Sequence, residues 1–359
     1  MIRFIVNRLL NGLLVICGVV VIIFFLFAVL PADPARMMLG QRADSTSVAI
    51  INKDLGRDLP VSSQFLMYVN DLSPVSAHSL NKNSRFYLDT AKYSNAVVIF
   101  SIGEKQLVIK PPFLRRSYQN KKNVSEIIAG KLPDTGVLAF AAILFAAFFG
   151  IILGMLAALK KGSKTDSAIL AFSLSGVSMP SFFASIIFAW LFGFVLSKYT
   201  GLNMTGGLYE IDAFRGVYIE WKNLILPAIV LGLRPMAIIV QLTRSSMLDV
   251  LSQDFIRTAR AKGLSSKAII IRHALRNALN PVITSISGWL GSLLAGAVFI
   301  EFIFGWNGIG KLTVTALDNY DLPVVTGIVL FISVIFIILN IIADVFNGML
   351  DPRIRLNTE

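Results

Sequence analysis

The stretch TGVLAFAAILFAAFFGIILGMLAAL, residues 135–159, decides the fold class, because it contains no charged side chain over 25 consecutive positions. As an α-helix it would be about 38 Å long, whereas the hydrocarbon core of a bilayer is about 30 Å thick. About 20 mainly apolar residues suffice for a spanning helix. We therefore expect this run to cross a membrane.

Five further stretches complete the pattern. Four carry no charge, and the fifth, residues 224–243, is interrupted only by Arg234-Pro235. Pro180 also lies inside an apolar run, and membrane helices accept proline where neighbours satisfy the freed carbonyl groups. The expected spans are residues 13–30, 135–159, 167–197, 224–243, 277–300 and 322–343. The first run is too long for a signal peptide and lacks a clean cleavage site, so we expect it to be retained.

Composition agrees with a membrane protein. Of the 359 residues 55% are hydrophobic and 15% are charged, and the mean hydropathy is +0.71. An average soluble domain is about 25% charged. These values exclude a disordered, collagen-like or nucleic-acid-binding soluble chain, and the single Cys17 excludes an internal disulfide.

The net charge of +12 is explained mostly by the orientation of the spans in the membrane. If the N-terminus is cytoplasmic, the cytoplasmic segments hold 14 Lys and Arg, and the two short external loops hold 4. Positive residues favour the cytoplasmic side, so both termini are expected there. Residues 31–134 then form a long external loop. Two apolar runs in it, 96–101 and 106–110, flank Gly103 and predict a β-hairpin within a small α/β unit.

The expected fold is therefore an all-α polytopic membrane protein with six helices and a small α/β insertion after the first. Its parts are an N-terminal segment with the first helix (1–30), an external loop domain (31–134) and a five-helix core (135–359). A cytoplasmic loop, 244–280, lies within that core.

No motif for catalysis is found. Residues 305–311, GWNGIGK, resemble a phosphate-binding loop, but Leu312 replaces the required hydroxyl and an apolar span precedes the run instead of a strand. We interpret it as a glycine-rich turn on the external side. His78 and His273 are the only histidines, and neither stands in a metal-binding motif. No enzyme activity and no metal site are expected in this chain.

Small and polar residues inside the spans are the remaining candidates for packing or for a pathway. Gly150 and Gly154 are four residues apart and favour close helix contact. A second set, on one face of the fifth span, packs either within the chain or on a partner subunit. A polar pair, Asn340 and Asp344, lies near the end of the sixth span. Glu301 and Arg234 are expected nearer the membrane edges. The candidates are Gly288, Ser292, Gly296, Asn340 and Asp344.

The loop between the fourth and fifth spans is the most informative segment. Residues 248–264 are basic and helix-like, Gly263 supplies a stop, and Ser265 can cap a second helix over 267–277. The predicted helix–glycine–helix elbow is either an amphipathic loop on anionic lipid or a docking element for a cytoplasmic partner.

Several motifs of this chain resemble one family in order. Residues 254–264, DFIRTARAKGL, and 272–281, RHALRNALNP, are similar to the cytoplasmic loop of ABC-importer permeases, specifically the B-type subunit of the dipeptide/oligopeptide/nickel family. The runs DPARMMLG (33–40), LGRDLPV (55–61), FGWNGIGK (304–311) and DPRIR (351–355) also resemble it.

The resemblance implies a permease of a bacterial inner membrane that imports a solute. The implied partners are a C-type permease, two cytoplasmic ABC ATPases, an external substrate-binding protein and membrane lipid, without nucleic acid. This chain would hold no cofactor, since ATP and Mg²⁺ belong to the ATPases. The residues implied to couple to an ATPase are Arg257, Thr258, Ala259, Arg260, Ala261, Lys262, Gly263 and Leu264.

The chain departs from the family pattern at two places. The general motif of importer permeases, E-A-A-x-x-x-G, begins with a glutamate. This chain has Arg257 at that position, so the resemblance implies no acidic contact with the ATPase there. The external loop contains additional residues, 74–112, which contact the binding protein, pack on the partner permease or decorate the surface. Short peptides are the expected substrates, and nickel or another small solute is the alternative. The rivals from other classes are a non-transporting scaffold and a proton-coupled carrier.

Overall fold

The computed structural model describes residues 2–29, 44–54, 56–81, 84, 86–89, 92–93, 95–214 and 216–350. The motifs at 33–40 and 351–355 lie outside these residues. The chain is mainly helical and divides into two compact units. The larger unit contains residues 1–11, 131–314 and 334–359, and the smaller contains 12–130 and 315–333.

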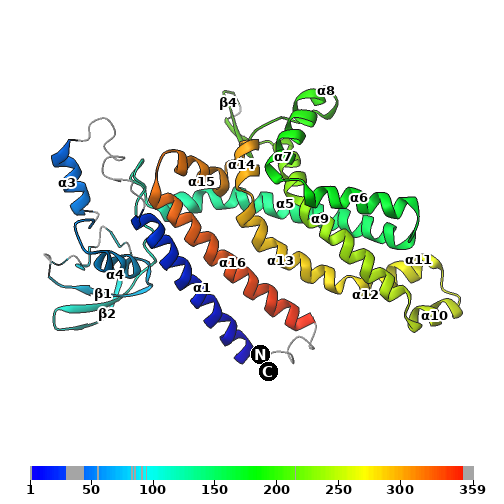
Figure 1. The fold of residues 1–359 in the computed structure, drawn as a ribbon, viewed down its shortest axis with the longest axis horizontal. Coiled ribbons are helices and arrows are strands. Elements are labelled where there is room, and N and C mark those ends of the chain that lie inside the picture. The colour runs from blue at the N-terminus through cyan, green and yellow to red at the C-terminus, as the bar shows by residue number, and fades with distance from the viewer. Residues whose placement is uncertain are drawn as a thin grey trace. The chain divides into compact units, whose positions relative to one another are not determined.

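The larger unit is built around one long helix, α9 (Lys222–Leu251). It contacts α6 (Lys164–Ser178), α7 (Ser181–Phe188), α13 (Asn280–Gly296) and α14 (Val298–Phe304), as Figure 1 shows. Helix α5 (Val124–Leu159) also packs on α9 through two glycines. A Cβ atom at Gly150 would lie 2.6 Å from Ile239 Cγ2, and one at Gly154 would lie 2.6 Å from the Val240 carbonyl oxygen. This close contact confirms that the Gly150/Gly154 pair packs within the chain.

Two of the expected spans are bent. α6 and α7 meet at 109° around Met179-Pro180, and α13 and α14 meet at 60°. The straight apolar helices long enough to cross a bilayer in the described residues are Val6–Leu26 of α1 (Ile2–Val29), α5, α9 and Leu322–Val345 of α16 (Leu322–Leu350). The total is four such helices, or up to six if each bent pair counts as one span.

Shorter elements join these helices. α7 continues into a π-helix, η2 (Ala189–Val195), and then α8 (Ser197–Thr200). A two-stranded antiparallel hairpin, β4 (Tyr209–Asp212) and β5 (Gly216–Ile219), precedes α9. The segment after α9 contains α10 (Asp254–Ala261), α11 (Ser266–Ala268), the π-helix η3 (Ile269–Leu275) and α12 (Arg276–Ala278). Helix α15 (Ile309–Asp318) follows α14.

The smaller unit contains a three-stranded antiparallel sheet in the order β1-β3-β2 and the helices α3 (Ser45–Asp54) and α4 (Val61–Leu72). Strands β2 (Val97–Ile102) and β3 (Lys105–Ile109) form the predicted hairpin, with Gly103 in its turn at φ +57°. The third strand, β1 (Val75–Ser79), was not predicted, since its five residues include Ser76, His78 and Ser79. The sheet buries Ser76, His78 and Val108 on one face.

A polar cluster occupies the core of this unit. The Asp71 carboxylate accepts hydrogen bonds from Lys92 Nζ (2.9 Å) and the Tyr93 hydroxyl (2.6 Å). Lys110, only 2% exposed, donates from Nζ to the Asp71 carbonyl oxygen at 2.7 Å, and its ammonium lies 4.7 Å from the centre of the Tyr93 ring. Burial lowers the pKa of Lys110 to about 8. Burial, and then the charge of Lys110, lowers the pKa of His78.

Candidate functional site

The segment 254–278 folds as the predicted elbow, which we call the arm. Gly263 lies in the left-handed region at φ +78°, as its position between two helices predicts. The Ser265 hydroxyl accepts a hydrogen bond from the Ala268 N–H at 3.4 Å, which confirms the predicted cap. The second helix differs from the expectation because its central part, η3, is a π-helix.

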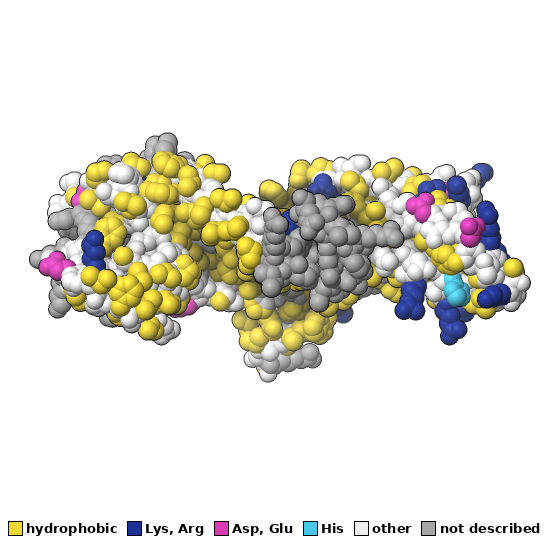
Figure 2. All heavy atoms as spheres, turned by 90° about the horizontal axis from the view of Figure 1, so that it is seen from below, with side chains coloured by type: hydrophobic (Ala, Val, Ile, Leu, Met, Phe, Trp, Pro, Cys, Tyr) yellow, Lys and Arg dark blue, Asp and Glu magenta, His cyan; other side chains and the backbone are white. Residues whose placement is uncertain are grey.

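The arm exposes a basic surface. Of the eight residues implied to couple to an ATPase, seven are exposed and Ala259 is buried. Figure 2 shows Lys and Arg side chains gathered at the right of the view, where the arm lies. Besides Arg257, Arg260 and Lys262, the exposed basic residues of the arm are Lys267, Arg272 and Arg276.

The arm is anchored on the ends of two long helices by an apolar core. Ile256 and Ala259 of α10 pack with Met247 and Val250 of α9 and with Ala158 of α5. From the second half of the arm, Ile269, Ala274 and Ala278 join the same core. The arm and the ends of α5 and α9 therefore share one close-packed apolar core.

The other predicted site residues lie at separate places. Gly288 is exposed, and a Cβ atom there would meet nothing within 4 Å, so it makes no close helix contact in this chain. The neighbouring Ser292 lines a pocket. Gly296 ends α13. Asn340 is half-buried, and one turn later Asp344 pairs with Arg8 at 3.1 Å.

The glycine-rich turn binds a carboxyl group that belongs to the chain itself. Glu301, fully buried, accepts hydrogen bonds from the N–H groups of Gly310 (2.7 Å) and Lys311 (3.2 Å) and from the Thr135 hydroxyl (2.8 Å). The Trp306 indole N–H donates to the Asp134 carbonyl oxygen at 2.9 Å. The second and third N–H groups of α15 thus donate to Glu301, where a nucleotide-binding loop would hold a phosphate, and the first, that of Ile309, donates to the Thr135 hydroxyl at 2.8 Å.

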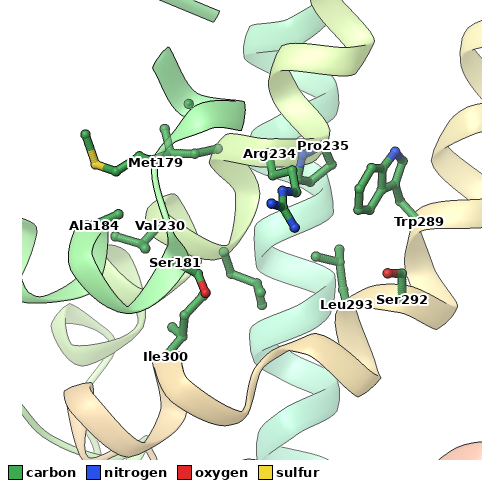
Figure 3. A pocket seen from close by; sticks show the side chains of 13 residues that line it. Met179, Ser181, Ala184, Val230, Arg234, Pro235, Trp289, Ser292, Leu293 and Ile300 are labelled. Carbon is green, nitrogen blue, oxygen red and sulfur yellow. The ribbon is translucent and has the colours of Figure 1, made fainter. Parts of the chain in front are cut away.

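A pocket of about 100 Å³ lies between α6, α7, α9, α13 and α14. Figure 3 shows the Arg234 guanidinium pointing into it, opposite Leu293 and close to Trp289. The sequence places Arg234 nearer a membrane edge, and in the structure it is the thirteenth of the 30 residues in α9, close to the middle of this helix. The lining residues are Gly176, Met179, Ser181, Ala184, Val230, Leu231, Leu233, Arg234, Pro235, Trp289, Ser292, Leu293 and Ile300.

Sequence reasoning missed this pocket and the role of Glu301. The signal for the pocket was present, since Arg234-Pro235 alone interrupts its apolar run. The contacts of Glu301 with Thr135 join residues 166 positions apart, and local patterns carry no information about such pairs.

The segment that contains the arm and the pocket matches a known family model. Residues 150–356 match the model described as "Binding-protein-dependent transport system inner membrane component", and residues 1–84 match the N-terminal model of such components. The chain belongs to this family. A binding-protein-dependent inner membrane component is a transport protein, and the apolar helices of this chain agree with a membrane location.

Full-length relatives agree with that membership. The chain is 36% identical to the di/tripeptide transport system permease protein DppB of Pseudomonas aeruginosa, over 99% of each chain. It is 35% identical to the dipeptide permease protein DppB of Escherichia coli K12 over 99% of each, and 30% identical to the glutathione permease protein GsiC of Salmonella choleraesuis, also over 99% of each. These matches confirm the resemblance to the B-type permeases of the dipeptide/oligopeptide/nickel family.

A solved structure shares the fold. A chain of the MetNI methionine ABC transporter, in an inward-facing conformation, superposes with a TM-score of 0.52 at 14% identity. The match covers 63% of this chain and 97% of that chain. At this identity the likeness shows that the two chains share a fold.

Proposed function

We propose that the chain is the B-type permease of an ATP-driven importer of di- and oligopeptides and forms half of the translocation pathway. The observation that carries the proposal is the arm: a basic, exposed element whose apolar core is continuous with α5 and α9. The substrate class rests on the peptide permeases that the chain resembles over its full length. Import of nickel or another small solute is the alternative substrate, and a non-transporting scaffold is the alternative function.

In this proposal the arm receives the motion of a cytoplasmic ATPase. Residues 257–264 contact the ATPase, whose closure on ATP displaces the arm. The load passes through Ile256, Met247 and Val250 into α9, and the helices change between outward- and inward-facing arrangements. ATP and Mg²⁺ stay on the ATPases, and no covalent step takes place in this chain.

The remaining assignments follow from the same proposal. Each bent helix pair counts as one span, which gives six, with both termini in the cytoplasm and residues 31–134 as an external insertion. A C-type permease packs on the face of α13 that carries Gly288, where a close approach is open. Two ATPases and an external binding protein complete the importer. Asn340 and Asp344 stand near the cytoplasmic end of the last span, where Arg8 neutralises Asp344.

The arm is tested at Gly263, whose positive φ a β-branched residue resists. With the complete importer in proteoliposomes, loaded binding protein should stimulate ATP hydrolysis. We expect Gly263→Val to reduce this stimulation at least tenfold, with the importer still assembled. Gly263→Asn is the matched control, because asparagine tolerates the left-handed conformation, and it should keep most of the stimulation.

Three results would contradict the proposal at different points. Full stimulation in Gly263→Val would remove the coupling role from the arm. No stimulation in the wild-type importer would favour the scaffold. If ATP hydrolysis were stimulated and radioactive nickel were taken up, while a labelled dipeptide was not, the substrate class would be different.

A further inference from the structure

Arg234 is a charged group deep inside an apolar helix. It lies about 18 Å along the axis of α9 from the first residue, at 1.5 Å per residue. An arginine at such a depth is costly, and those found there face a bundle interior or a water-filled cavity along a substrate or ion route. Figure 3 shows that this guanidinium faces the pocket.

Arg234 is also the only charged residue among the thirteen that line the pocket. Within the described part of the chain, no carboxylate pairs with it. The second arginine of α9, Arg244, differs in this respect, because Asp166 binds its guanidinium through both carboxylate oxygens at 2.7 and 2.8 Å. The pocket therefore presents one cation whose donors are available to an anionic ligand.

A helix that contains a proline and a bent helix pair meet at the pocket. Pro235 has no N–H, so the carbonyl group of Leu231, one turn earlier and also in the lining, lacks its usual donor within α9. Ser181 is the first residue of α7, directly after the 109° bend. Broken helices with free backbone groups at membrane depth are typical of transport sites, since irregular backbone is tolerated there only around a cavity.

We propose that this pocket binds the carboxylate of the substrate during its passage, with Arg234 as the residue that holds it. The inference rests on the proposed import function. The guanidinium offers two parallel N–H donors that match a carboxylate, and a short peptide always carries one at its C-terminus. Trp289 and the flexible Met179 form apolar walls that accept side chains of different size.

The charge preference of the pocket can be measured with reagents of opposite sign. In a Cys17→Ser chain, Ser292→Cys places one thiol in the lining. The assembled importer is treated with the anionic 2-sulfonatoethyl and the cationic 2-trimethylammonioethyl methanethiosulfonates. We expect the ratio of anionic to cationic rates to fall at least fivefold on Arg234→Gln and to stay within twofold on Arg234→Lys.

The control applies the same reagents to Ser265→Cys, on the exposed arm. There the ratio of anionic to cationic rates should be the same with Arg, Gln or Lys at position 234. An unchanged ratio at Ser292→Cys on Arg234→Gln would overturn the proposal. So would a thiol at position 292 that neither reagent reaches, because a transport pocket must admit water.

Transport supplies a second readout. At saturating loaded binding protein, we expect Arg234→Gln to lower the maximal rate of dipeptide uptake at least tenfold, while stimulated ATP hydrolysis stays within twofold. Arg234→Lys, which keeps the positive charge but loses the two parallel donors, should lower uptake less than Arg234→Gln. Undiminished uptake in Arg234→Gln would overturn the carboxylate role. A wild-type importer that takes up no peptide would instead contradict the proposed function, and the reagent ratio would still test the pocket.

Discussion

Glu301 and Arg234 are both charged residues within apolar helical segments of the larger unit, yet their surroundings are opposite. The Glu301 carboxylate is fully buried and accepts three hydrogen bonds, from Thr135, Gly310 and Lys311. Arg234 faces a pocket and has no carboxylate partner in the described residues.

The difference teaches how to separate structural charges from functional ones. A buried charge whose bonds are all made within the chain holds segments together, and losing it leaves its partners unpaired. A charge that faces a cavity without a partner adds nothing to the fold and is available to a ligand. The two residues should therefore respond differently to substitution.

The largest effect is expected from Glu301→Leu. It leaves two N–H groups of α15 and the Thr135 hydroxyl without their acceptor, and each buried group left unpaired costs about 1–3 kcal/mol of stability. The unfolding midpoint in detergent, followed by tryptophan fluorescence, reports it, because the buried Trp306 lies in the same turn. Arg234→Gln should change the midpoint little, and equal losses in both variants would show that the comparison is wrong.

A smaller loss is expected from Gly308→Ala, which tests how tightly the turn encloses Glu301. The added Cβ would lie 2.3 Å from Thr135 Oγ1 and 2.5 Å from Glu301 Oε2, so the carboxylate must shift. Overpacking of this kind costs about 1–3 kcal/mol. Gly288→Ala is the matched control: its Cβ meets nothing within 4 Å, and helix propensity favours alanine there by about 0.5–1 kcal/mol. A destabilised Gly288→Ala together with a neutral Gly308→Ala would contradict this picture.

The last prediction extends the comparison to another buried charge, Lys110 of the smaller unit. Its pKa is about 8 in the folded chain and 10.5 when unperturbed, so the unfolded state binds more protons between these values. Stability of the sheet should therefore rise with pH from about 8 toward 10. Burial raises the pKa of Tyr68 to about 12, so above pH 10 the folded state keeps a proton that the unfolded state loses. Stability should therefore fall with pH above 10.

Hydrogen–deuterium exchange of peptides from β1 to β3 in the intact chain, corrected for intrinsic rates, measures this dependence. In Lys110→Met the rise between pH 8 and 10 should disappear. Below pH 6.5 protection should fall in both proteins, because the lowered pKa of His78 favours proton uptake on unfolding. A wild-type sheet with no pH dependence between 8 and 10 would show that the Lys110 charge is accommodated without cost.

Local patterns predicted much of this molecule. Hydropathy located the apolar helices, and the glycine and serine signals located the arm, because Gly263 and Ser265 act on their immediate neighbours. The bend at Met179-Pro180 was not predicted, since proline is compatible with a continuous membrane helix. The pocket and the Glu301 turn depend on which helices meet, and one chain's sequence does not encode those pairings in any local signal.

The closure of the Glu301 turn sets an order of events during synthesis. Thr135 meets its partner 166 residues later, and the Asp134 carbonyl oxygen meets Trp306 172 residues later. At about 5–20 residues per second, a ribosome needs on the order of 10–30 s to cover that interval. Throughout that time the newly inserted α5 lacks both contacts. The core around α5 therefore stays incomplete until residue 311 has been synthesised, and a chain truncated before Glu301 can never complete it.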